Sequence, residues 1–294
     1  MEGTGAEAVE PLRSPPLPER GGRAPISGWS LMAIPGLVVL ALTALAPLGW
    51  ILVRSVADGG WDDYGRLFAH SYLASFRQTI YIAFVVAIVT TALAYPFAYA
   101  LKTGPKWLRA VLVATLVISF ASADVSRTFG WQTLLQNTGV INVLLKSVGV
   151  IEQPLPLMYN DFGTVLGTSS VLLPFGAMTI YANLRNVNTD VVLAAQTLGA
   201  RRLTAVMRIL VPMTVPGIAA CAGLIFVLTL GFYVTPARLG DPKQPMISGL
   251  IVDSASFGDF GRAAAMSVVL LVLAVIIGGL VSGGASLLGK RSSK

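Results

Sequence analysis

The chain has 294 residues, of which 54% are hydrophobic and only 12% are charged. This composition excludes an ordinary soluble domain and favours a membrane protein. Lysine and arginine outnumber the acids by 21 to 14, for a net charge of +7. The excess follows the membrane topology described below, so it does not indicate a nucleic-acid partner.

Residues 1–27 mix prolines with acids and arginines and show no apolar periodicity. Such a segment has too little apolar surface to form a packed core. We therefore expect a disordered cytoplasmic tail over residues 1–27, ahead of a transmembrane domain over residues 28–290.

Five stretches without ionisable residues are each long enough to cross a bilayer as a helix. A sixth, between Arg109 and Asp124, has 14 residues and would by itself fit a buried helix equally well. Counting it as a span that continues to about Gly130 predicts six spans, at about 29–53, 76–101, 107–130, 161–184, 209–233 and 263–288.

The charge distribution supports the sixth span. With six spans, 13 cations and 5 acids fall on one side, which nets +8, and the other side nets −1. Cytoplasmic loops carry an excess of Lys and Arg, so the positive side is the cytoplasm. The sequence therefore predicts an all-α integral membrane protein with six transmembrane helices and both termini cytoplasmic, residues 291–294 forming the second tail.

The connection between the third and fourth spans holds Ile141, Leu144, Leu145 and Val148 at helical spacing. This pattern predicts a short helix at the outer interface.

The cytoplasmic loop after the fourth span has the signals of a helix, a bend and a second helix. Thr189 or Asp190 can cap a helix that begins at Val191, because a side-chain oxygen there accepts from the amides of the first turn. Gly199 lies two turns later and favours a stop or a bend. A second helix is then expected from Ala200 into the membrane.

Proline shapes the start of the fifth span. Pro212 lies where the span begins, and Pro216 is expected to kink its first turns. Arg201 and Arg202 remain before the membrane, where they face solvent or a partner.

Several classes of chemistry have no support in the sequence. It lacks GxxxxGK[ST], HExxH, CxxC and GxSxG motifs, so neither a nucleotide site, nor a metal site, nor a catalytic residue is predicted. Cys221 is the one cysteine, which excludes an intrachain disulfide.

The loop segment LAAQTLGARRLTAVMRILVPMTVPG, residues 193–217, resembles the signature loop of ABC importer permeases. That loop is an E-A-A group followed at fixed spacing by Gly, Ile and Pro, and the matching positions here are Ala194, Ala195, Gly199, Ile209 and Pro212. This sequence departs from the pattern with Leu193 at the glutamate position and Val211 at a leucine position.

Further motifs over about residues 70–285 resemble the spermidine/putrescine-type branch, and specifically its first permease subunit. They are Tyr95-Pro96 with Ala98-Tyr99, Arg127-Thr128 with Trp131, Gly139 with Ile141-Asn142, Leu173-Pro174-Phe175, and Gly231 with Val234-Thr235-Pro236 and Leu239-Gly240.

The resemblance implies a type I ABC importer permease, multi-pass in a bacterial plasma membrane. Its implied partners are a second homologous permease in a heterodimer, two cytoplasmic ABC ATPases that bind ATP and Mg, and an extracytoplasmic solute-binding protein. No cofactor is expected on this chain. Transport would follow alternating access, driven by closure of the ATPase pair.

In that family the signature loop forms the helix that docks on the ATPase. The resemblance therefore implies a coupling loop over residues 189–208, with contacts from Asp190, Leu193, Ala194, Ala195, Gly199, Ala200, Arg201 and Arg202. With leucine at position 193, the usual acidic contact must be apolar or move to Asp190.

For the solute, the resemblance implies a polyamine, with ferric iron, phosphonate, thiamine and opine compounds as alternatives. Other functions kept open are an ion-coupled secondary transporter and a scaffold subunit. Candidate pathway residues are acids and aromatic residues near the outer ends of the spans, together with one arginine: Asp124, Arg127, Trp131, Tyr159, Asp161, Tyr233, Asp253 and Asp259. Asp124 and Arg127 are three residues apart, so a purely structural ion pair is the alternative there.

Overall fold

A computed structural model describes residues 28–57, 60–67, 69–188 and 190–292. Every regular element in these ranges is a helix. The expected tail over residues 1–27 lies outside them. Contacts divide the chain into residues 1–49 and residues 50–294, and each unit is described separately.

The first unit holds most of α1 (Gly28–Ala57), which contains Pro35 and Pro47. The stretch Pro35–Ala57 is long and apolar enough to cross a bilayer, and the most apolar part of it is not buried against other residues of the chain.

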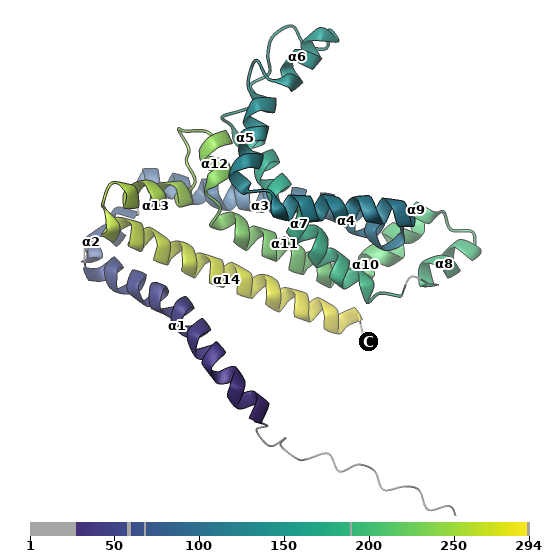
Figure 1. Cartoon of the computed structure of the whole chain (residues 1–294), viewed down its shortest axis with the longest axis horizontal. Helices are drawn as coiled ribbons and strands as arrows, with labels where there is room; N and C mark the ends of the chain where they lie inside the picture. Colours follow the sequence, from purple (N-terminus) through teal and green to yellow (C-terminus); the bar gives the residue numbers. More distant parts are fainter. Residues whose placement is uncertain (1–27, 58–59, 68, 189, 293–294) are drawn as a thin grey trace, which may run out of the picture. The chain divides into compact units, whose positions relative to one another are not determined.

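The second unit is built around α3 (His70–Thr103), α4 (Lys106–Ala121), α7 (Asp161–Arg185), α11 (Val215–Leu230) and α14 (Phe260–Ser292), which run side by side (Figure 1). Four helices of the described chain are long and apolar enough to span, and up to six if each of two bent pairs crosses once. The predicted helical membrane architecture is confirmed, and the number of spans stays between these limits.

Small residues let α3 and α7 approach closely. Ala83, Ala87, Ala94 and Ala98 are buried along one face of α3, and a Cβ added to Gly176 of α7 would lie 3.2 Å from the Cβ of Ala94. Lipid tails are as apolar as these side chains, so association in a membrane depends on such close packing rather than on a hydrophobic driving force.

The predicted span over residues 107–130 is not one helix. α4 ends at Ala121, and the following pair α5 (Asp124–Leu135) and α6 (Val140–Ser147) is bent by 104° from it. Ser122 and Ala123 are extended, and Asp124 starts the new helix, where its negative charge is favourable at the helix N-terminus. α5 and α6 form an arm that projects from the bundle (Figure 1).

The predicted fifth span is also bent, as its prolines suggested. α9 (Arg202–Ala205), the π-helical turn η1 (Val206–Leu210) and α10 (Val211–Met213) meet α11 at an angle of 70°. The bend falls at Thr214.

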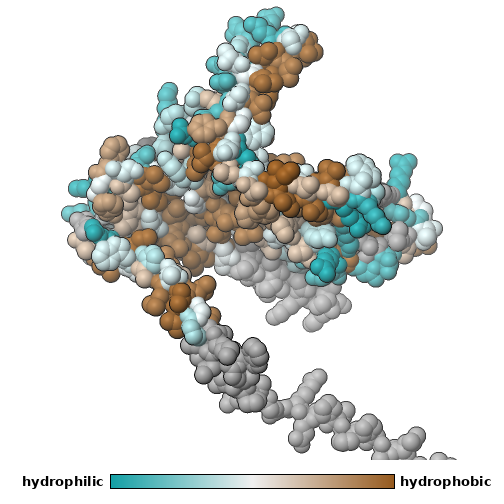
Figure 2. Space-filling view, viewed as in Figure 1, coloured by the Kyte–Doolittle hydropathy of each residue, from teal (hydrophilic) through white to brown (hydrophobic). Residues whose placement is uncertain are grey.

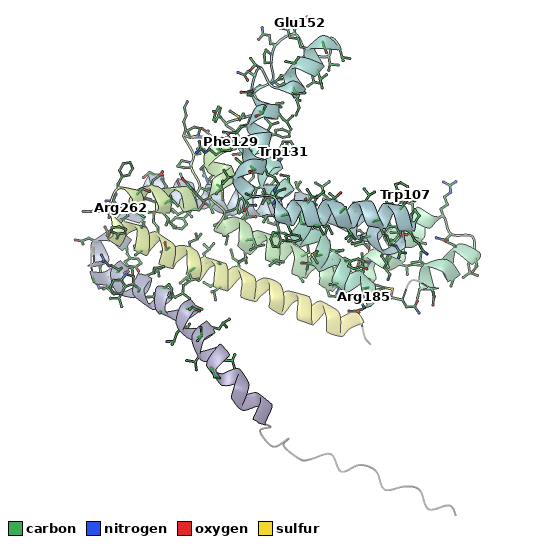
Figure 3. The ribbon with its side chains drawn as sticks, in the orientation of Figure 1. Trp107, Phe129, Trp131, Glu152, Arg185 and Arg262 are labelled. Atoms are coloured by element: carbon green, nitrogen blue, oxygen red, sulfur yellow. The ribbon has the colours of Figure 1, made fainter. Side chains whose placement is uncertain are left out.

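The remaining helices cap the two ends of the bundle. Figure 3 places Trp107 and Arg185 at one end, called here the coupling end, and Arg262 at the opposite, distal end. The coupling end carries α8 (Asp190–Thr197), α9, η1 and α10, and the distal end carries α2 (Gly60–Leu67), α12 (Val234–Leu239) and α13 (Ile247–Ser256). The predicted alternation of loops between the two faces of the membrane stays a prediction. That the coupling end faces the cytoplasm stays a prediction.

Apolar side chains are exposed on the second unit at positions that fit contact with lipid or another subunit. Figure 2 shows them over α4 and along the arm, and they include Val117, Ile118, Val143 and Val148.

Candidate functional site

The coupling loop has the predicted helix–bend–helix form. α8 begins at Asp190, whose N–H donates to Oδ1 of Asn188 at 2.8 Å, so the Asn188 side chain satisfies one amide of the first turn. Thr189, the alternative cap, lies outside the described residues. Gly199 has φ +90°, a left-handed conformation that other residues adopt only with strain.

The side chains of the coupling loop divide into an inner and an outer set. Val192 is buried, and Ala195 and Ala200 pack against the same hydrophobic core as α3, α7 and α11. Asp190, Ala194 and Arg201 are exposed. The side chains of Leu193 and Arg202 are outside the described set, so the contact predicted for them stays a prediction.

The sequence analysis missed Leu198. Its side chain is 88% exposed at the tip of the loop, next to Gly199. A large apolar side chain at the tip of a loop that the family resemblance assigns to ATPase docking is a candidate contact for that partner. The sequence did contain a signal for this exposure. Leu198 directly precedes the glycine that ends the helix, so no following turn of the helix can cover its side chain.

Lys102 ties the base of the loop to the bundle. Its Nζ donates to the carbonyl oxygens of Leu184 at 2.6 Å and Val187 at 2.7 Å, at the C-terminus of α7. A cation is favourable there, because the last carbonyls of a helix carry partial negative charge. The loop therefore leaves the membrane domain from a fixed point.

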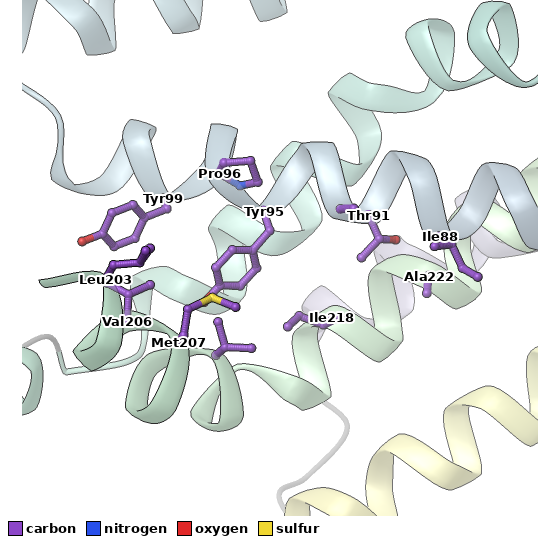
Figure 4. A pocket seen from close by; sticks show the side chains of 12 residues that line it. Ile88, Thr91, Tyr95, Pro96, Tyr99, Leu203, Val206, Met207, Ile218 and Ala222 are labelled. Carbon is purple, nitrogen blue, oxygen red and sulfur yellow. The ribbon is translucent and has the colours of Figure 1, made fainter. Parts of the chain in front are cut away.

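A cavity of about 850 Å³ lies between α3 and the segment that joins the loop to α11. In Figure 4 the rings of Tyr95 and Tyr99 project from α3 toward Leu203, Val206 and Met207, with Ile218 and Ala222 on the α11 side. The lining is apolar apart from hydroxyl groups. The cavity therefore fits an apolar neighbour, or leaves room for the surrounding helices to move, and does not fit a charged solute.

At the distal end, three of the four candidate acids already have partners. Asp124 accepts from Nη2 of Arg127 at 3.2 Å, Asp161 accepts from Nε2 of Gln78 at 2.6 Å, and Asp259 pairs with Arg262 at 3.0 Å. The structural alternative for Asp124 and Arg127 is thus supported by their geometry. Asp253 on α13 is exposed.

The structure brings only part of the candidate pathway together. Arg127 and Trp131 on α5, Asp161 on α7 and Tyr233 before α12 belong to elements that pack on one another. Asp253 and Asp259 instead belong to α13 and the start of α14, which pack with α2 and α3.

Two side-chain hydrogen bonds, each with at least one hydroxyl group, connect α5 with α12 and with α7. Thr128 and Thr235 lie 2.9 Å apart, and the indole of Trp131 donates to Oγ of Ser170 at 2.7 Å. The structure therefore gives Trp131 a positioning contact, which leaves less of its ring edge for a solute.

Tyr159 is an exposed residue with a strained backbone. Its φ is +62°, and its N–H donates to the carbonyl oxygen of Leu239 at 2.8 Å. Left-handed non-glycine residues persist only where the surroundings fix them, and they occur often at functional sites.

A smaller cavity of about 210 Å³ opens between α5 and α12. It is lined by Thr128, Phe129 and Tyr233, and the guanidinium of Arg238 lies 5.6 Å from the ring centre of Phe129. Among the described residues, no group of three His, Cys, Asp or Glu side chains is placed to hold a metal ion.

Comparison with known proteins identifies the type of membrane protein. Residues 155–293 match the family described as binding-protein-dependent transport system inner membrane component. The chain is 28% identical over 251 residues to the spermidine/putrescine transport system permease protein PotB of Escherichia coli, covering 84% of this chain and 90% of PotB. The PotB protein of Salmonella typhimurium is 27% identical, with 84% and 87% covered.

A solved structure shares the fold. The bacterial alginate ABC transporter, crystallised with its alginate-bound periplasmic protein, has a chain that superimposes with a TM-score of 0.71 at 18% identity. It covers 90% of this chain and 96% of its own length. Taken with the family match and the PotB relatives, this shared fold makes the chain a multi-pass bacterial inner-membrane protein with the role of an ABC importer permease subunit.

Proposed function

We propose that this permease imports a polyamine of the spermidine or putrescine type, which an extracytoplasmic binding protein delivers. A second permease completes the pathway, and two ATPase subunits that bind ATP and Mg drive it from the cytoplasm. The observation that carries the proposal is the coupling loop, because an exposed helix–bend–helix set on a fixed base is the feature that an ATPase can move.

The docking surface is the outer set of the coupling loop. Leu198 and Ala194 offer an apolar contact, with Asp190 and Arg201 beside them. Gly199 allows the sharp turn that brings the tip forward. With leucine at position 193, where related loops carry a glutamate, the contact at this loop is apolar at Leu198.

The polyamine assignment rests on similarity to PotB and on the chemistry of a cationic solute. The membrane potential favours entry of a cation by about 2.3 kcal/mol per charge per 100 mV. Because Asp124, Asp161 and Asp259 are engaged within the chain, we place selectivity mainly in the binding protein. On this chain the exposed Asp253 and the exposed Tyr159 are two separate contacts for ammonium groups.

Co-purification tests the class of transporter. The tagged permease, extracted in mild detergent from its own host, is expected to bring down a second permease and an ATPase. An ion-coupled secondary transporter would instead transport alone in liposomes, and a scaffold would neither transport nor retain an ATPase.

A thermal-shift screen of the cognate binding protein tests the solute. We expect spermidine or putrescine to raise its melting temperature, and ferric citrate, aminoethylphosphonate, thiamine and octopine to leave it unchanged. A shift with one of the other four solutes would keep the importer assignment and replace the polyamine.

A further inference from the structure

The coupling loop is joined to α11 by a segment that is not a rigid rod. From Gly199 the chain passes through α9, the wide turn η1 and α10, and then turns by 70° at Thr214. π-helical turns and kinks are common at functional hinges. A movement of the loop would therefore be absorbed at Thr214 unless something fixes the bend.

The other hydrogen bonds of Thr214 determine whether Tyr95 or Thr214 donates in the bond between their hydroxyl groups. Thr214 Oγ1 lies 3.0 Å from the carbonyl oxygen of Leu210 and 2.9 Å from that of Val211. Carbonyls only accept, so the single hydroxyl proton of Thr214 is used there. The hydroxyl of Tyr95, 3.1 Å from Thr214 Oγ1, must then donate to it.

Tyr95 belongs to the part of the bundle that is held most firmly. It lies on α3 beside the fully buried Ala94 and Ala98, and Lys102 fixes the end of that helix to α7. Thr214 is 1% exposed, so its hydroxyl takes its partners from neighbouring protein groups. This hydrogen bond joins the bend to α3.

The cavity of about 850 Å³ leaves space next to this bond. Its lining includes Tyr95, Val211 and Ile218, from both sides of the bend. The bend therefore has room for a second angle once the bond is broken.

We infer that the hydrogen bond from Tyr95 to Thr214 is the latch that makes α11 follow the coupling loop, and that Tyr95 is a positioning residue for transport. This rests on the proposed docking of the ATPase on the loop. While the hydrogen bond is formed, a movement of the loop at Leu198 turns α11. When the bond is absent, the segment from α9 to α10 bends at Thr214 and α11 does not turn.

The test uses the whole transporter in liposomes with its loaded binding protein. Tyr95→Phe keeps the ring and removes the hydroxyl, and Thr214→Val keeps the shape and removes the acceptor. We expect each to lower the number of spermidine molecules imported per ATP hydrolysed by about two- to tenfold, the factor that one hydrogen bond supports. The double variant is expected to lose no more than either single variant, because both remove the same bond. Tyr181→Phe on α7, which packs against the same core, is the matched control.

A second readout is independent of the solute. Spin labels at Phe84→Cys on α3 and Leu224→Cys on α11, both exposed positions, report how far α11 moves relative to α3; Cys221 is buried and stays unlabelled. We expect a distance shift on trapping with ATP and vanadate, and loss of that shift in Tyr95→Phe. An unchanged shift, or additive losses in the double variant, overturns the latch. If the wild-type permease retains no ATPase, the proposed function fails and the latch falls with it.

Discussion

The ammonium group of Lys102 lies 2.6 Å from the carbonyl oxygen of Leu184, and this contact joins the ends of α3 and α7 where the coupling loop begins. The same ammonium also donates to Val187. A charged donor that satisfies two helix-end carbonyls stabilises more than a neutral one.

Lys102→Met should therefore destabilise the protein while keeping most of the side-chain volume. We expect a loss of about 1.5–3 kcal/mol, the usual contribution of hydrogen bonds to a charged group, seen as a lower midpoint of thermal unfolding in detergent. Lys106→Met, at an exposed position at the start of α4, is the control. Equal midpoints for the two variants would contradict the assigned role.

Gly199 is predicted to be needed for its backbone conformation alone. No atom lies within 4 Å of a Cβ added there, but its φ of +90° strains any L-residue. Gly199→Ala should cost about 1–2 kcal/mol at this turn, and both Gly199→Ala and Gly199→Trp should reduce uptake without preventing membrane insertion.

Gly249→Ala is the matched control for Gly199, because Gly249 also has open space around its Cβ position but lies within α13. Full uptake by Gly199→Trp would remove the support for the coupling loop.

Leu198 should contribute to ATPase binding rather than to folding. Leu198→Ala removes an 88% exposed side chain, so the unfolding midpoint should not change. The amount of ATPase retained on the tagged permease should fall about tenfold or more, as expected for an apolar anchor at an interface. Val148→Ala, 75% exposed on the arm, tests whether any exposed apolar residue has this effect.

Asp253 and Asp161 should respond differently to removal of their charge. Asp253→Asn, at an exposed carboxylate, is expected to raise the KM of spermidine uptake without a change in stability. Asp161→Asn should mainly lower the unfolding midpoint, because it weakens the bond with Gln78. A raised KM for Asp161→Asn at unchanged stability would move Asp161 back into the solute pathway.

The helices were predictable from the sequence, but two of their breaks depend on tertiary structure. Charge-free intervals located every long helix because a bilayer requires about 20 apolar residues. The end of α4 at Ala121 was missed, since no proline or glycine marks Ser122 and periodicity alone does not detect a change of direction. The bend near Pro216 carried a local signal and was predicted.

Side-chain partners were the least predictable part of the candidate site. Asp124 and Arg127 are close in sequence, so their pairing could be proposed. Asp161 and Gln78 are 83 residues apart and meet only because α3 and α7 pack in parallel. From the sequence, Asp161 was predicted to be a free acid in the solute pathway. The packing of α3 against α7 instead gives it Gln78 as a hydrogen-bond partner.

At Gly217, α11 lies so close to α7 that a single added methyl group would clash. Gly217→Ala therefore tests this helix contact. A Cβ added at Gly217 of α11 would overlap Cγ of Asn183 on α7 and lie 2.6 Å from its Cβ. Gly217→Ala therefore forces the two helices apart, and overpacking of this kind costs about 1–3 kcal/mol. We expect a lower unfolding midpoint and less purified permease.

The clash has a specific remedy. Asn183→Ala removes the Cγ and the amide that a new methyl group would meet but keeps the Cβ at 2.6 Å, so the double variant Gly217→Ala, Asn183→Ala should recover part of the lost stability. Gly231→Ala, with no atom within 4 Å of the added Cβ, controls for the intrinsic effect of replacing glycine near the end of α11. If Asn183→Ala gave no recovery, the instability of Gly217→Ala would have to come from the backbone of α11 rather than from its contact with α7.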